Sequence, residues 1–81
     1  MINKDFGSII SSKRKEHRLS QPQLAALMGE HGLDVKAHSI SKWEKNINLP
    51  NVLQFFALCE ILDITDINET FGIGNSLYAQ L

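Results

Sequence analysis

Basic, hydroxyl and amide side chains are concentrated between residues 36 and 48. In this segment Lys42 could bind the O6 and N7 atoms of guanine or a phosphate, and His38 could donate or accept a hydrogen bond at a base edge. Both side chains could instead be solvated, so residue type alone leaves these readings open. Four neighbours suit phosphate contacts or plain solvation: Lys36, Lys45, Asn46 and Asn48.

Catalytic and metal chemistry have weaker support. The histidines and the one cysteine, Cys59, form no pair at metal-ligand spacing on one element. Cys59 lies in the most apolar segment, which favours a small core residue over a nucleophile. Serine–histidine and paired-carboxylate arrangements would lack an enclosing pocket in so short a chain. We therefore expect no enzyme activity, no metal site and no cofactor.

Length and composition indicate one small folded domain, because the chain has 81 residues of which 43% are hydrophobic. A single cysteine cannot form an intramolecular disulfide, and no stretch is typical of a secretory signal or a membrane span. These observations predict a cytoplasmic protein that does not contact a membrane.

The charges are distributed unevenly, although the net charge is only −1. All eight Lys and Arg residues fall within residues 1–45, where five acids leave +3, whereas residues 46–81 hold four acids and no base. Random surface patterning is one interpretation. The other interpretation is that the folded protein has a basic face, which binds an anionic partner, and an acidic face on the opposite side.

Apolar residues recur at helical spacing along most of the chain, and no segment alternates convincingly like a strand. Ser20 is expected to cap the second helix, Gly32 to end it and Pro50 to start the fourth. Asp34 could help to cap the third. Apolar residues cover more than one face of the fourth helix, which predicts packing from several sides. The expected helices, about residues 4–17, 20–32, 36–45, 50–62 and 66–71, define an all-α fold of five short helices.

The stretch "LSQPQLAALMG…VKAHSISKWEKN…LPNVLQFFALCEILDI" combines Gln21 at a helix start, the small Ala25 where two helices would cross, the turn glycine Gly29 and the buried aliphatic Ile40. In this combination the chain resembles the helix-turn-helix domain of phage-repressor and Cro-like regulators, the XRE class, over about residues 6–71. The resemblance implies a lambda-repressor-like fold. It also implies a structural pair between Arg14 and Glu44.

Residues 36–45 match the recognition helix, with Val35, Ile40 and Trp43 turned inward and a polar face left outside. The resemblance implies that this helix enters the major groove while Gln21 bonds a phosphate. Ala37 could pack on a thymine methyl or have no contact with DNA. Ser39 could contact a phosphate or donate a hydrogen bond to a backbone carbonyl of its own helix. The expected DNA-binding residues are Gln21, Lys36, Ala37, His38, Ser39, Ser41, Lys42, Lys45, Asn46 and Asn48.

One feature departs from the family pattern. Five extra residues, 30–34, separate Gly29 from the recognition helix, which predicts an enlarged turn between the second and third helices. They most simply prolong the second helix until Gly32 ends it. Gly29 would then be helical, at a cost of about 0.5–1 kcal/mol relative to alanine.

These observations predict a bacterial or phage transcriptional regulator, a repressor that binds double-stranded operator DNA as a homodimer. An antitoxin of the same fold is one alternative. A protein-interaction module that no longer reads DNA is another, and the near-neutral charge and weakly basic recognition face favour it.

The expected domain covers residues 1–71, and residues 72–81 form a tail, a linker or a dimerisation arm. A frayed tail is the plain interpretation of that end. Exposed Phe71, Ile73, Leu77 and Tyr78 would suit a self-complementary apolar patch, or a tail folded back onto the core. A C-terminal regulatory domain, found in many relatives of this type, could follow.

Overall fold

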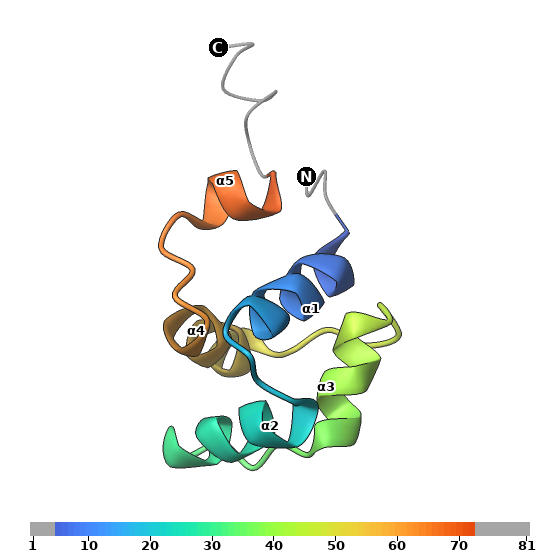
Figure 1. Ribbon diagram of the computed structural model, residues 1–81, viewed down its shortest axis with the longest axis vertical. Helices are drawn as coiled ribbons and strands as arrows, with labels where there is room; N and C mark the ends of the chain where they lie inside the picture. The colour runs from blue at the N-terminus through green and yellow to red at the C-terminus, as the bar shows by residue number, and fades with distance from the viewer. Residues whose placement is uncertain (1–4, 73–81) are drawn as a thin grey trace, which may run out of the picture.

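The computed structural model describes residues 5–72, and within them the chain forms five helices and no strand (Figure 1). The helices are α1 (Phe6–Glu16), α2 (Gln21–Glu30), α3 (Ala37–Glu44), α4 (Val52–Ile61) and α5 (Ile67–Phe71). The all-α class predicted from the sequence is confirmed. No helix among these residues has the length and apolarity needed to cross a membrane.

Side-chain caps fix where the helices begin. Ser20 accepts a hydrogen bond from the Gln23 amide, and the Gln23 side chain accepts one from the Ser20 amide, as a capping box. Asn51 and Gln54 form the same reciprocal pair, so α4 begins after Asn51 and not at Pro50 as expected. Asp66 accepts a hydrogen bond from the Glu69 amide and caps α5.

Helices α1 to α4 are each followed by a residue with left-handed backbone. Gly32 takes this conformation after α2, with φ of 81°, and confirms the expected stop. Arg18, Asn46 and Asp63 take it after α1, α3 and α4, with φ between 58° and 60°. In each case the next amide donates to the carbonyl five residues earlier: Leu19 to Arg14, Leu33 to Met28, Ile47 to Lys42 and Ile64 to Cys59. These hydrogen bonds satisfy carbonyls that the helix itself leaves unpaired.

The turn between α2 and α3 is enlarged, as the sequence indicated. Helix α2 runs through Gly29 to Glu30, and six residues precede Ala37, the first residue of α3. Asp34 does not cap α3, because the N-cap position is Lys36 and no side chain accepts from the first turn. Asp34 instead lies 3.4 Å from the Lys36 ammonium, as an exposed ion pair.

The core is formed by buried side chains from all five helices, with Val35, Leu62 and Ile64 from the connecting segments. Its fully buried side chains are Ile10, Leu24, Met28, Ile40, Leu58, Leu62 and Phe71. The ring of Phe71 stacks on Phe6 at 5.4 Å between centroids and lies 5.6 Å from Phe55, which ties α5 to α1 and α4. Phe71 was expected on an exposed patch, and that expectation is wrong because this aromatic cluster encloses it. The other three residues of that patch lie outside the described residues.

Helix α4 is not packed on all sides. Ala57, Leu58 and Cys59 are buried, but Val52 and Leu53 are each 66% exposed and Phe56 is 57% exposed. The expectation of a helix packed from several sides is therefore wrong for its first half. Helical spacing places positions 52, 53 and 56 on one face, and no described element covers that face.

Candidate nucleic-acid interface

Helix α3 is anchored by its inner side. Ile40 and Trp43 are 0% and 3% exposed, and Val35 is buried just before the helix. These side chains hold α3 against α1 and α2, and Figure 1 shows α3 rising steeply from the start of α2. The inward set expected from the sequence is confirmed, so the opposite side of α3 faces outward.

The residues expected to contact DNA differ in exposure. Lys36, His38, Lys45, Asn46 and Asn48 are exposed, whereas Gln21, Ala37, Ser39, Ser41 and Lys42 are half-buried. Three of the set, Lys36, His38 and Lys45, place basic or imidazole groups at the surface near the two ends of α3. Lys42 lies in the last turn of α3 and is partly covered along its length. A lysine can keep its ammonium group in water while its stem is covered.

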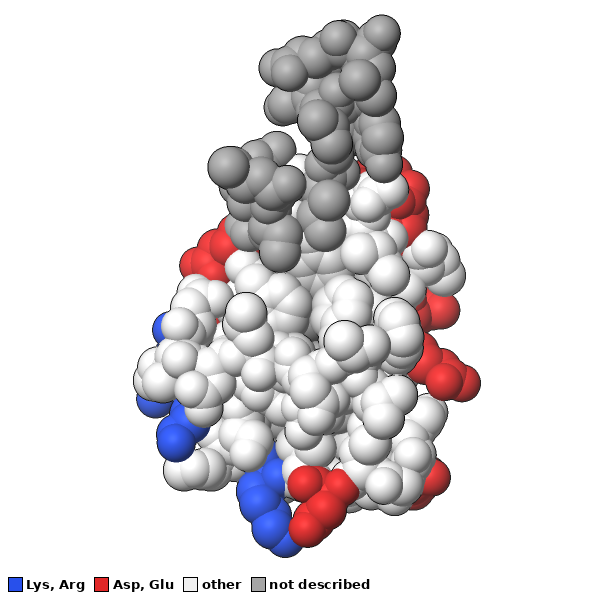
Figure 2. Space-filling view, turned by 180° about the vertical axis from the view of Figure 1, so that it is seen from behind, with Lys and Arg blue, Asp and Glu red and all other residues white. Residues whose placement is uncertain are grey.

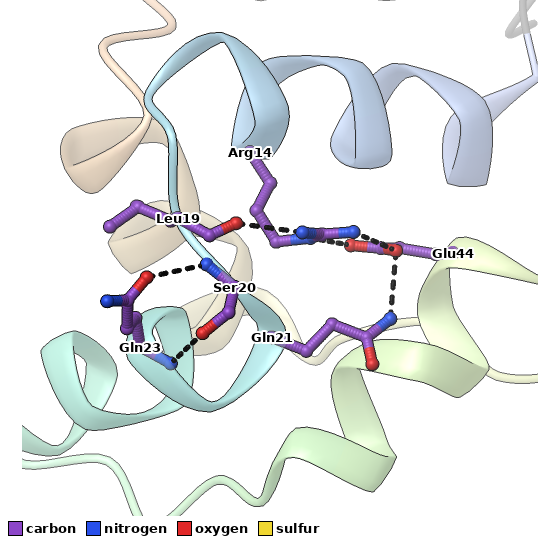
Figure 3. A network of polar contacts seen from close by, with 6 residues as sticks. All are labelled: Arg14, Leu19, Ser20, Gln21, Gln23 and Glu44. Carbon is purple, nitrogen blue, oxygen red and sulfur yellow. Dashed lines mark hydrogen bonds and ion pairs between the residues drawn. The ribbon is translucent and has the colours of Figure 1, made fainter.

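Arg14 and Glu44 form the structural pair that the resemblance implied (Figure 3). The guanidinium donates from Nε to one carboxylate oxygen at 2.6 Å and from a terminal nitrogen to the other at 3.0 Å. A third donor of Arg14 reaches the Leu19 carbonyl at 2.8 Å. Both charged side chains are largely buried, at 11% and 8% exposure, so the pair fixes the end of α3 to α1 and to the α1–α2 connection.

The ionisation of this pair is set by its surroundings. Burial alone raises the pKa of Glu44, but hydrogen bonds from Arg14 and Gln21 and the guanidinium charge outweigh it, so the pKa is lowered. The hydrogen bond to Glu44 raises the pKa of Arg14. Both groups therefore stay charged at neutral pH.

Gln21 also belongs to this network. Its Nε2 donates to a Glu44 oxygen at 3.0 Å, so the first residue of α2 contacts the last residue of α3 (Figure 3). The phosphate contact that the sequence analysis expects of Gln21 stays a prediction beside this bond. In the structure Gln21 links the start of α2 to the end of α3.

The side-chain amide of Asn46 also forms hydrogen bonds within the protein. Its Oδ1 accepts from the Gly7 amide at 2.9 Å, and its Nδ2 donates to the Asp5 carboxylate. The hydrogen bond from Asn46 is the largest cause of the lowered pKa of Asp5. Asn46, expected at a phosphate, thus links the end of α3 to the start of α1.

Gly7 is a residue whose role the sequence reasoning missed. A Cβ atom at this position would overlap the backbone carbonyl of Glu44 and crowd that of Trp43. Only glycine allows α1 and α3 to approach so closely. The available signal was a glycine inside a helical pattern, which implies a turn, a stop or a close contact.

The enlarged turn leaves an open groove beside α2. It is lined by Pro22, Ala25, Ala26, Gly29, Gly32, Leu33, Asp34, Val35, Lys36 and Ala37. Most of these side chains are small, and they belong to α2, to the turn and to the first residue of α3. Within residues 5–72 no group of three His, Cys, Asp or Glu side chains could hold a metal ion.

Together, the anchored helix α3, the steeply crossing α2 and the bonds between them define a helix-turn-helix protein of the DNA-binding regulator type. A sequence model described as "Helix-turn-helix" matches residues 10–69, which is most of the chain. The chain therefore belongs to the helix-turn-helix family of phage-repressor and Cro-like proteins, a DNA-binding regulatory family and not an enzymatic one. Comparisons with curated proteins and with solved structures give no significant match.

Proposed function

We propose that this protein is a sequence-specific transcriptional repressor that binds operator DNA as a homodimer and inserts α3 into the major groove. The observation that carries this proposal is the way α3 is held. Its buried side is fixed by Ile40 and Trp43, and its end is fixed by Glu44. A rigid helix with an outward polar side is what base readout requires.

The charge distribution supports the α3 side of the molecule as the side that binds DNA. Figure 2 shows Lys and Arg on the lower left and at the bottom, and Asp and Glu mainly on the right, with further acidic groups at the upper left and beside the basic group at the bottom. In the sequence, Lys36, Lys42 and Lys45 belong to α3 or its flanks, whereas the four acids after residue 46 belong to α4, α5 and the segment between them. DNA phosphates would favour an approach on the α3 side.

Within α3 we assign base contacts to His38, Ser41 and Lys42, and a thymine-methyl contact to Ala37. Lys36, Ser39, Lys45 and Asn48 are assigned to phosphates. Gln21 and Asn46 would contribute mainly by holding α2 and α3, because their side-chain amides already bind Glu44, Gly7 and Asp5.

The test is a selection of bound sites from a random duplex pool at two salt concentrations. An inverted repeat with half-sites about 34–36 Å apart is expected for a dimer with two recognition helices. Placing that site in a promoter should lower reporter expression when the protein is supplied, and increased expression would identify an activator instead. Sequence-blind or absent binding would contradict DNA reading and favour a protein-interaction module.

A further inference from the structure

The enlarged turn brings negative charge to the start of α3. Its five extra residues, 30–34, include Glu30 and Asp34 and no Lys or Arg, whereas the rest of residues 1–45 carries a net positive charge. Both acids are exposed. Figure 2 shows acidic groups beside a basic group at the bottom of the molecule, the end where Figure 1 shows α2 and the turn before α3. Positive charge is what attracts DNA, so two carboxylates at this place require an explanation.

The enlarged turn is held in place at three points. Val35 is only 8% exposed, and the Leu33 amide donates to the Met28 carbonyl of α2 at 3.1 Å. The His31 ring lies 3.4 Å from the carboxylate of Glu60 on α4. The segment that carries the two exposed acids therefore has a defined position next to α3.

Asp34 and Lys36 lie on the same side of this segment. Buried Val35 stands between them, and Lys36 has extended backbone, with φ of −98° and ψ of 155°, in which alternate side chains point the same way. Asp34 Oδ1 lies 3.4 Å from the Lys36 ammonium, and the two side chains are 91% and 77% exposed. No side chain caps the first turn of α3, so the Asp34 carboxylate pairs with Lys36 and not with the helix amides.

We propose that Asp34 competes with DNA phosphates for the ammonium group of Lys36 and so limits the affinity of the α3 side for any duplex. This inference rests on the proposed function, in which Lys36 binds a phosphate. An exposed ion pair is weak, so a phosphate can displace Asp34, and the pair lowers DNA affinity without preventing binding. Weaker phosphate binding leaves a larger share of the binding free energy to base contacts. Asp34 is thus a positioning residue that acts on DNA through Lys36.

The first experiment measures binding of Asp34→Asn to a duplex of random sequence by fluorescence anisotropy at several salt concentrations. The variant is expected to bind about 3–5-fold more tightly at low salt, with a log–log salt slope steeper by about 0.5–1, because Lys36 is free to neutralise a phosphate. Asp63→Asn is the matched control, since it makes the same change at an exposed residue after α4, where asparagine tolerates left-handed backbone. Equal gains in the two variants, or no gain in Asp34→Asn, would overturn the proposal.

A double-mutant cycle with Lys36→Met separates competition from direct repulsion. In the Lys36→Met background, Asp34→Asn should tighten binding by less than about 2-fold, because no ammonium group is left to release. An undiminished gain would mean that the carboxylate repels phosphates by itself, and would overturn the proposal. Loss of preference at one base position in Asp34→Asn would assign the carboxylate to a base and would overturn it as well.

The ion pair itself can be observed without DNA. The NMR signal of the Lys36 ε-methylene group should move in Asp34→Asn and stay in place in Asp63→Asn. The thermal unfolding midpoint of Asp34→Asn should stay at the wild-type value, since Asp34 does not cap α3.

These measurements distinguish the two proposals. If the Lys36 signal moves but no variant binds duplex DNA, the proposed function fails and the DNA part of this inference fails with it, while the ion pair stands. If DNA is bound as proposed but the Lys36 signal does not move, this inference fails and the proposed function stands.

Discussion

Gly7 and Glu44 meet where α1 crosses the end of α3, and no Cβ atom fits between them. The backbone amide of Gly7 also donates a hydrogen bond to the Asn46 side chain, so a hydrogen bond and a close backbone contact occur at the same residue. The Arg14–Glu44 pair lies two turns further along α1. The end of α3 is thus fixed to α1 at two separate places, which is how a small domain holds a helix without a larger core.

Replacing Gly7 by alanine is expected to destabilise the fold. Overlap with backbone atoms cannot be relieved by a side-chain rotation, so we expect a loss of about 1–3 kcal/mol in the free energy of unfolding despite the better helix propensity of alanine. Gly29→Ala is the matched control, because it is also helical and a Cβ there meets nothing within 4 Å. Gly29→Ala should stabilise the chain by about 0.5–1 kcal/mol. Urea denaturation of both variants measures the difference, and equal effects would contradict the close approach.

Much of this arrangement could be predicted from the sequence. Local signals with a single physical meaning, such as the Ser20 cap and the Gly32 stop, were confirmed. The Arg14–Glu44 pair came from the family resemblance and is present. Such features depend on nearby residues or on a pattern shared by many chains.

The rest depended on tertiary contacts that no local pattern encodes. Gly7 is tied to residues far along the chain, and the apolar residues of α4 gave no sign of which side would be covered. The amide side chains of Gln21 and Asn46 could bind a phosphate or a protein group, and residue type does not distinguish these partners. The fold shows that Gln21 binds Glu44 and that Asn46 binds Asp5, just before α1.

Acid should weaken the fold through Glu44. The pKa of Glu44 is lowered in the folded chain. Its contribution to the free energy of unfolding is therefore fully present above the ordinary pKa of 4.5 and is lost as the pH falls through the lowered pKa of the folded chain. Glu44→Gln should cost about 2–3 kcal/mol at neutral pH, because it removes charge-assisted hydrogen bonds to a largely buried arginine. It should also flatten the loss of stability below about pH 4.5.

Denaturation curves at several pH values test this expectation. Asp5→Asn is the necessary comparison, because the pKa of Asp5 is also lowered and this exposed group titrates in the same acid range. If Glu44→Gln keeps the acid slope of the wild type while Asp5→Asn loses it, the slope belongs to Asp5 and not to the buried pair.

Two left-handed residues should respond differently to glycine. Arg18→Gly removes the strain of a side chain at φ of 58° and is expected to stabilise the chain by about 1 kcal/mol. Asn46→Gly relieves the same strain but loses the bonds to Gly7 and Asp5, so it should be neutral or destabilising by up to about 1 kcal/mol. Thermal unfolding compares them. A stabilised Asn46→Gly would mean that its side-chain bonds contribute little.

The contacts assigned to α3 can be separated by their salt dependence. Lys45→Ala should weaken binding to all DNA sequences and reduce the log–log salt slope by about 1, as expected for a lost phosphate contact. Lys42→Ala should instead relax the preference at one base position, at a cost of about 1–3 kcal/mol in discrimination, because a lysine that reads guanine distinguishes it from other bases.

Lys13→Ala is the control, since its ammonium pairs with Glu16 on α1 at 3.8 Å, away from α3. Fluorescence anisotropy on the selected site and on single-base variants, at several salt concentrations, measures both quantities. If Lys42→Ala changes only the salt slope, Lys42 binds phosphate, and base readout then rests with His38 and Ser41.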